Sequence, residues 1–130
     1  MAKLALLYVE DDPVGRGLIS KAISLKFPQM TLLVAENGLE GLQLYKKHKP
    51  ELVLTDMQMP VLDGISMASE IKRLQPDAEI ILVSAYCDIP EYRTRSKEAG
   101  ITQCIPKPVD HRKLFSAIEK SIAEAEREIS

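Results

Sequence analysis

The most constraining feature of this sequence is a set of short apolar runs that each stop at a charged or hydroxyl-bearing side chain. LALLYV is followed by the acidic run Glu10–Asp12, ELVLT by Asp56, EIILV by Ser84, and CIP by Lys107 and a proline. Such runs are typical of strands buried on both faces of a parallel sheet. Because open parallel sheets bind ligands at the carboxyl ends of their strands, we expect these groups to meet at one edge.

Segments with helical periodicity separate the apolar runs. We expect strands at 4–9, 31–35, 52–55, 80–83 and 101–105, and helices at 13–27, 38–48, 65–74, 90–99 and 111–129. Strict alternation of strand and helix predicts right-handed crossovers and a parallel sheet covered on both faces. The fold class is therefore α/β, with a doubly wound sheet.

Residues at the expected helix ends support these limits. Asp12, Asn37 and Asp110 are of types favoured at helix N-caps. Gly100 follows the fourth helix, where a left-handed residue commonly ends a helix. The second helix is expected to turn three leucines towards the sheet, namely Leu39, Leu42 and Leu44.

The length and charge of the chain indicate one domain with neither a membrane nor nucleic acid as a direct partner. We expect a single domain over residues 1–130, with its core at about 4–123 and a helical tail or the start of a connector at 124–130. The net charge of −2 includes no basic stripe, which argues against direct nucleic-acid binding. The longest apolar stretches are too short to span a membrane.

The two cysteines indicate a reducing, cytoplasmic setting. Cys87 and Cys104 are too few and too separated for a disulfide framework or a zinc site, and the N-terminus does not resemble a signal peptide. Their thiols could lie close together if their strands are neighbours. We nevertheless expect free thiols, because disulfides rarely persist in reducing compartments.

The acids at the strand ends require a positive partner. Glu10, Asp11 and Asp56 would repel one another if they were brought together. A lysine offsets part of that charge, and a hard divalent cation such as Mg²⁺ suits the remaining carboxylate oxygens. The alternative, that these acids are only helix caps, fits Asp12 and Asp63 but not the other three. We therefore expect a metal site.

The same residues carry a resemblance to a known family. The chain resembles the CheY-like receiver domain of two-component response regulators over about residues 4–123. The matching motifs are YVEDDP, LTDMQMPVLDG, VSA and KP, in this order along the chain. Each motif alone is weak, but their order and spacing are specific. The resemblance implies a flavodoxin-like sheet of five parallel strands in the order 2-1-3-4-5, with five helices.

The resemblance also implies a chemistry. Asp56 corresponds to the phosphoacceptor, which takes a phosphoryl group from a phosphohistidine with the help of Mg²⁺. Lys107 is expected to pair with the phosphoryl group, and its peptide bond to Pro108 is expected to be cis. The implied metal ligands are Glu10, largely through water, Asp11, Asp56 and the backbone carbonyl of Gln58.

The resemblance further implies a switch. Ser84 is expected to turn towards the phosphoryl group and draw the following loop with it. An aromatic residue usually responds three positions before the lysine, but Cys104 stands there, so Tyr86 or the weakly anchored fourth helix is expected to respond instead. Tyr86 and Gln58 occupy positions that flank the path of the hydrolytic water. We therefore expect Tyr86 to lengthen the lifetime of the phosphorylated form, or else to serve as an interface aromatic.

The expected partners are a sensor histidine kinase or a histidine phosphotransfer protein, together with an unidentified output domain or target. A homodimer through the fourth helix, fifth strand and fifth helix is also possible. The last helix repeats apolar residues at coiled-coil spacing, which predicts either packing on the sheet with a solvated tail or the start of a connector or dimer contact. These residues are Phe115, Ile118, Ile122, Ala125 and Ile129.

Three other classes of protein compete with this interpretation. A dinucleotide-binding enzyme needs a glycine-rich turn where the acids Glu10–Asp12 stand. A haloacid-dehalogenase-type phosphatase needs a second acid where Gln58 stands. A non-phosphorylated receiver-like binding module would not require Asp56, Ser84 and Lys107 together. We therefore expect a slowly self-dephosphorylating switch rather than a turnover enzyme.

Overall fold

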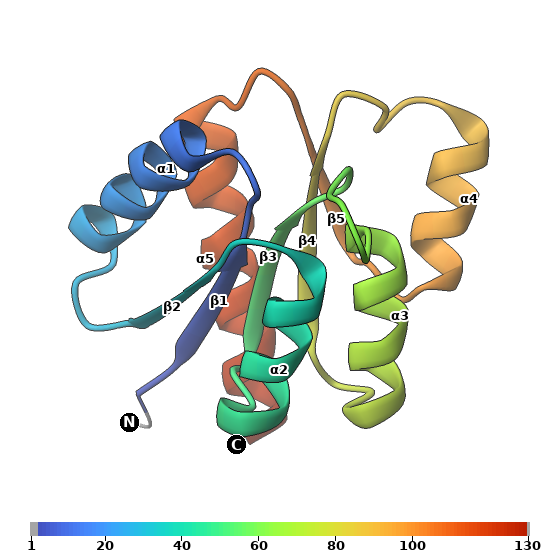
Figure 1. Ribbon diagram of the computed structural model, residues 1–130. Helices are drawn as coiled ribbons and strands as arrows, with labels where there is room; N and C mark the ends of the chain where they lie inside the picture. The colour runs from blue at the N-terminus through green and yellow to red at the C-terminus, as the bar shows by residue number, and fades with distance from the viewer. Residues whose placement is uncertain (1–2, 130) are drawn as a thin grey trace.

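The computed structural model describes residues 3–129, in which five strands alternate with five helices (Figure 1). The strands are β1 (Ala5–Val9), β2 (Thr31–Ala35), β3 (Leu52–Asp56), β4 (Glu79–Ser84) and β5 (Gln103–Pro106). The helices are α1 (Pro13–Lys26), α2 (Gly38–His48), α3 (Gly64–Leu74), α4 (Pro90–Glu98) and α5 (His111–Ile129). Every expected element is present, and no boundary differs by more than two residues from the expected one.

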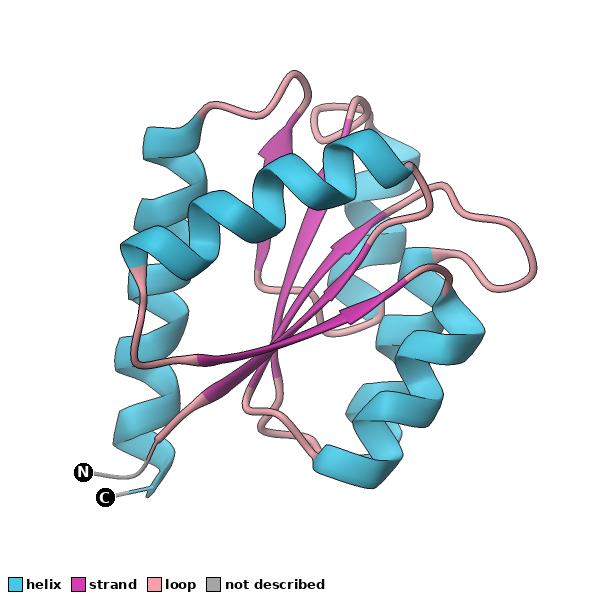
Figure 2. Ribbon diagram, turned by 60° about the vertical axis from the view of Figure 1, so that its left-hand side comes forward, coloured by secondary structure: helices cyan, strands magenta, loops and turns pink. Residues whose placement is uncertain are grey.

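All strand pairs are parallel, and the order across the sheet is β2-β1-β3-β4-β5. Helices α1 and α5 cover one face of the twisted sheet, whereas α2, α3 and α4 cover the other (Figures 1 and 2). The expected doubly wound, flavodoxin-like fold is therefore confirmed.

Two hydrophobic cores lie on opposite faces of the sheet. Leu6 of β1 belongs to the core under α1 and α5, and its neighbour Leu7 belongs to the core under α2, α3 and α4. Both are fully buried. Because successive side chains of a strand point to opposite faces, a strand covered on both sides must be apolar throughout. This is why the strands read as continuous runs in the sequence.

Helix α2 corrects one expectation about the core. Leu39 is 47% exposed, and Tyr45 is buried in its place, while the other two leucines are partly buried against the sheet. The reason is the close approach of α2 to β1, where a Cβ atom on Gly41 would lie 2.9 Å from Cγ2 of Val9. This approach rotates a glycine face towards the sheet and leaves Leu39 outside.

Helix α5 packs most of its apolar seam on the sheet. Ile118 and Ala125 are buried, and Phe115 and Ile122 pack against the same core. The side chain of Ile129, the last residue of the seam, lies outside the described residues. The described part of the seam is therefore occupied by the domain's own core, as the packing interpretation expects.

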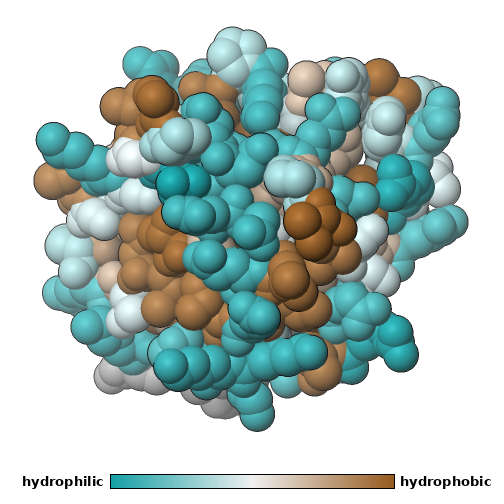
Figure 3. Space-filling view, in the orientation of Figure 1, coloured by the Kyte–Doolittle hydropathy of each residue, from teal (hydrophilic) through white to brown (hydrophobic). Residues whose placement is uncertain are grey.

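The surface in Figure 3 alternates hydrophilic side chains with separate apolar areas. Three strongly exposed apolar residues lie on one helix, α1: Val14, Leu18 and Leu25. Across residues 3–129, none of the helices combines the length and the apolar character that crossing a membrane requires.

Candidate phosphoacceptor site

The carboxyl ends of β1, β3, β4 and β5 lie along one edge of the sheet (Figure 1). The strand register sets this arrangement. Asp56 of β3 pairs with Val83 of β4, and Ser84 of β4 pairs with Pro106 of β5. On its other side β3 pairs with β1, whose last residue precedes the acidic run. The sheet therefore brings together the groups that the sequence places far apart.

Three carboxylates form a cluster at this edge. Glu10, Asp11 and Asp56 each offer one oxygen, and these oxygens lie within 4.8 Å of one another. Glu10 and Asp56 are buried, with exposed fractions of 8% and 4%, whereas Asp11 is exposed. The cluster can therefore be reached from solvent on the side of Asp11.

Burial makes the cluster electrostatically costly. It raises the pKa of Glu10 to about 7, and the negative charge of Asp56 acts in the same direction, while a hydrogen bond from the amide of Asp12 opposes it. Burial also raises the pKa of Asp56, against the opposing effect of Lys107. Because burial and neighbouring negative charge both disfavour the ionised form of these two acids, a cation at the cluster would stabilise their charged state.

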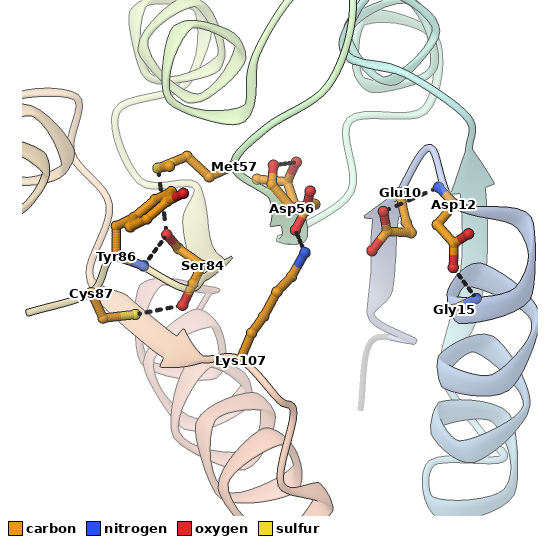
Figure 4. A network of polar contacts seen from close by, with 10 residues as sticks. Glu10, Asp12, Gly15, Asp56, Met57, Ser84, Tyr86, Cys87 and Lys107 are labelled. Carbon is orange, nitrogen blue, oxygen red and sulfur yellow. Dashed lines mark hydrogen bonds and ion pairs between the residues drawn. The ribbon is translucent and has the colours of Figure 1, made fainter.

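Lys107 supplies one positive charge. Its Nζ atom forms an ion pair with Oδ1 of Asp56 (Figure 4). Burial alone would lower the pKa of Lys107, but the hydrogen bond and the negative charge of Asp56 outweigh that effect and raise it. The peptide bond between Lys107 and Pro108 is cis, as expected. The lysine is therefore charged and directed at Asp56.

The backbone after Asp56 is fixed by Gly64, whose role the sequence analysis missed. A Cβ atom on Gly64 would lie 2.1 Å from the carbonyl oxygen of Asp56, so only glycine fits. The Gly64 amide also donates to the carbonyl of Met57 at 2.8 Å. Asp63 caps α3 by accepting from the Ser66 amide. The Asp-Gly pair of the loop motif was the available signal, but it indicated only a turn.

Ser84 lies at this edge with its hydroxyl engaged elsewhere. Its Oγ accepts from the Tyr86 amide at 2.9 Å and donates to Sδ of Met57 at 3.5 Å (Figure 4). The residue is buried. Among the described residues, no hydrogen bond joins Ser84 to Asp56. The Ser84 hydroxyl would therefore have to give up Met57 before it could donate to a group on Asp56, whereas it could keep accepting from the Tyr86 amide.

Tyr86 lies towards α4. Its ring stacks on that of Tyr92 with centroids 5.3 Å apart and an interplanar angle of 21°. The depression around the acids is lined by other described residues, among them Glu10, Asp56 and Lys107. This arrangement favours the interface interpretation of Tyr86 over the shielding one.

The expectation of two free thiols is wrong in this structure. Cys87 and Cys104 form a disulfide, with their Cα atoms 5.9 Å apart. Cys104 pairs with Leu82 in the sheet, and the turn after Ser84 brings Cys87 back over that pair. The sequence showed that adjacent strands could bring the thiols together, but the turn geometry that does so follows from the fold.

Comparison with known proteins identifies the family. The model of the response regulator receiver domain matches residues 6–119. The transcriptional regulatory protein GlrR of Escherichia coli is 32% identical over 122 residues, which cover 92% of this chain and 26% of that protein. The chemotaxis protein CheY of Halobacterium salinarum is 35% identical over 118 residues, covering 91% and 95% of the two chains.

A solved structure agrees. The crystal structure of a CheY-like receiver domain protein from Methanospirillum hungatei has a TM-score of 0.89 at 25% identity and covers 98% of this chain and 99% of that one. The chain therefore belongs to the response regulator receiver domain family of two-component systems. It spans about a quarter of the length of GlrR, but nearly all of the Halobacterium CheY.

Proposed function

We propose that this receiver domain is a phosphoacceptor switch, in which Asp56 takes a phosphoryl group from a phosphohistidine on a sensor kinase or phosphotransfer protein. One observation carries the proposal. A buried carboxylate at a strand end stands within 4.8 Å of two further carboxylates and in an ion pair with a lysine. A nucleophile surrounded by both kinds of charge suits transfer of a negatively charged group.

The donor set fits Mg²⁺. Three carboxylates of one cluster offer the hard oxygen ligands that this cation prefers. The charge of Asp56 raises the pKa of Glu10, and the charge of Asp11 raises that of Asp56, so a divalent cation would offset a repulsion already present in the cluster. We assign Asp11 and Asp56 as direct ligands, Glu10 as a ligand through water, and the backbone carbonyl of Gln58 as the fourth group. The metal supplies charge neutralisation and alignment of the phosphoryl group.

The chain's own residues perform the remaining steps. A carboxylate oxygen of Asp56 attacks the phosphorus, the phosphorus–nitrogen bond of the phosphohistidine breaks, and the imidazole leaves. Lys107 then pairs with a phosphoryl oxygen, because its ammonium already stands against Asp56. Ser84 donates a hydrogen bond to another phosphoryl oxygen after its hydroxyl has turned away from Met57. Ala85 is exposed and small, so the incoming histidine meets no bulk there.

The test is uptake of a phosphoryl group from acetyl phosphate with and without Mg²⁺, followed by intact-mass measurement. We expect a mass increase of one phosphoryl group that requires Mg²⁺ and is absent in Asp56→Asn. The matched control is Asp77→Asn, which removes an exposed carboxylate in the turn before β4. Equal uptake by Asp56→Asn would contradict Asp56 as the acceptor, and no uptake by any form would favour a receiver-like protein-binding module instead.

The remaining assignments belong to the same proposal. We infer a cytoplasmic, self-dephosphorylating switch rather than a turnover enzyme, with one domain over the whole chain. The output is an unidentified target or an effector domain, because GlrR extends well beyond the matched region. A surface made by α4, β5 and α5 is the proposed contact for that output or for a second copy.

A further inference from the structure

The disulfide joins the two segments on which the proposed switch depends. Cys87 lies three residues after Ser84, in the loop that leads to α4. Cys104 lies in β5, three residues before Lys107. The bond therefore connects the loop that follows the responding hydroxyl with the strand that carries the lysine.

The disulfide and the sheet together hold a short segment at both of its ends. Leu82 pairs with Cys104 in the sheet, and Cys104 is bonded to Cys87. Residues 82–87 are thus held to one point of β5 through both the sheet register and the disulfide. The sheet already holds the Ser84 backbone, whose carbonyl accepts from the Lys107 amide at 3.1 Å, so the disulfide adds its restraint to residues 85–87 of the following loop.

One partner of the Ser84 hydroxyl lies within the closed segment. The hydroxyl accepts from the Tyr86 amide, which the tether helps to hold in place, and it donates to Met57, which follows β3. Sγ of Cys87 also lies 3.5 Å from the carbonyl oxygen of Ser84. A disulfide sulfur has no proton to donate, so this contact becomes a hydrogen bond only in the reduced thiol.

The bond can be reached by small molecules. Cys104 is exposed and Cys87 is partly exposed. A cavity of about 300 Å³ lies beside them, and Ser84 and Tyr92 are among its lining residues. An accessible disulfide is of the kind that thiols can reduce and reform, whereas structural disulfides resist reduction.

We propose that Cys87 and Cys104 form a reversible redox modification site whose oxidised state holds Ser84 away from Asp56 and so opposes phosphorylation. This inference rests on the proposed function. The oxidant is a low-molecular-weight disulfide. The thiolate of exposed Cys104 attacks it and releases one thiol, and the thiolate of Cys87 then attacks Cys104 Sγ and releases the second. Two protein thiols become one disulfide, and the released thiols carry the two protons.

Oxidation and phosphoryl binding are then linked reciprocally. If the disulfide weakens binding of a phosphoryl mimic by some factor, the mimic must disfavour disulfide formation by the same factor. Couplings between sites typically amount to about 5-fold to 150-fold. We expect beryllofluoride to bind the oxidised protein at least about fivefold more weakly than the reduced protein, in the presence of Mg²⁺.

The experiment compares the full chain after treatment with oxidised glutathione and after treatment with dithiothreitol. Intact mass reports the disulfide as the loss of two hydrogens. Hydrogen exchange of the Tyr86 amide measures the restraint on the loop independently of phosphorylation. The affinity for beryllofluoride measures whether the disulfide affects binding of a phosphoryl group. Cys104→Ser, at an exposed position, is the matched variant that cannot form the bond, and Cys87→Ser is the second. Both should bind beryllofluoride like the reduced protein under either treatment.

The outcomes separate the two proposals. Slower Tyr86 exchange together with weaker beryllofluoride binding in the oxidised protein supports the redox site. Absence of the disulfide after oxidation, equal Tyr86 exchange, or equal affinity of the two forms overturns it. If the reduced protein and both serine variants fail to bind beryllofluoride, the proposed function fails, and redox control of it fails with it.

Discussion

The two halves of the candidate site are held with different firmness. The half built on β1, β3 and α3 carries Glu10 and Asp56, both buried, and α3 buries five of its residues. The other half consists of the loop after β4, α4 and β5. None of the described residues of α4 is buried, and the N-cap residue Ile89 makes no side-chain capping hydrogen bond. Successive helices on one face of the sheet thus differ sharply in their anchoring.

This difference separates two tasks. In the proposed switch the charged cluster needs fixed geometry, because oxygens that are to hold a metal ion must stay within coordination distance. The elements proposed to respond need to move at low cost, and segments with few buried contacts open most easily. Glu10 and Asp56 therefore lie in the half built on β1, β3 and α3, which we call the firm half. Ser84 lies at its border with the other half, which consists of the loop after β4, α4 and β5 and which we call the movable half. The Cys87–Cys104 disulfide acts on the movable half only.

The largest expected effect tests the firmness of α3. Ile71 is fully buried in that helix, so Ile71→Ala should lower the free energy of unfolding by about 3 kcal/mol. Tyr92→Ala in α4, which loses a stacked ring at a partly exposed site, should cost about 1 kcal/mol. Urea unfolding of both variants measures the two values. Equal losses of unfolding free energy in the two variants would contradict the stronger anchoring of α3.

A second pair of variants tests the backbone beneath Asp56. Gly64→Ala should destabilise the fold by about 2 kcal/mol or more, because the new methyl group would overlap the Asp56 carbonyl. Gly17→Ala is the matched control in the middle of α1, where nothing lies within 4 Å, and it should stabilise by about 0.5–1 kcal/mol. Thermal unfolding distinguishes the two signs. A neutral Gly64→Ala would mean that the loop after β3 is not closely packed.

The third expectation concerns the charge on Glu10 in the metal-free protein. Its pKa is raised from 4.5 to about 7 in the fold, so the folded state retains a proton that the unfolded state loses. The resulting stability is fully present below pH 4.5 and is lost as the pH rises to about 7. Glu10→Gln carries no such charge. We expect the free energy of unfolding of Glu10→Gln, relative to that of the wild type, to increase across this pH window by on the order of 1 kcal/mol.

Denaturant titrations of both proteins in EDTA, at several pH values, measure this difference. Addition of Mg²⁺ above neutral pH should reverse this stability difference, because the ion should bind and stabilise the wild type, which has the Glu10 carboxylate, more than the variant. A stability difference that does not change with pH would contradict the assigned burial of this carboxyl group.

The sequence predicted the firm half better than the movable half. Continuous apolar strands reflect burial on both sheet faces, and the acids at the ends of β1 and β3 could therefore be placed at one edge before the fold was known. The partnering of Cys87 with Cys104 depends on one turn and one register, neither of which leaves a periodic signal. The closeness of Gly64 to Asp56 is likewise a property of packing, and the outward rotation of Leu39 follows from the glycine face of α2.

The most direct test of the central claim is to locate the phosphoryl group chemically. After treatment with acetyl phosphate and Mg²⁺, borohydride reduces an aspartyl phosphate to homoserine, which peptide mass spectrometry can place in the chain. The account predicts homoserine at position 56 in the wild type and no homoserine in Asp56→Asn. Homoserine at another acidic position, or an unmodified position 56 in protein that has taken up phosphoryl groups, would contradict it.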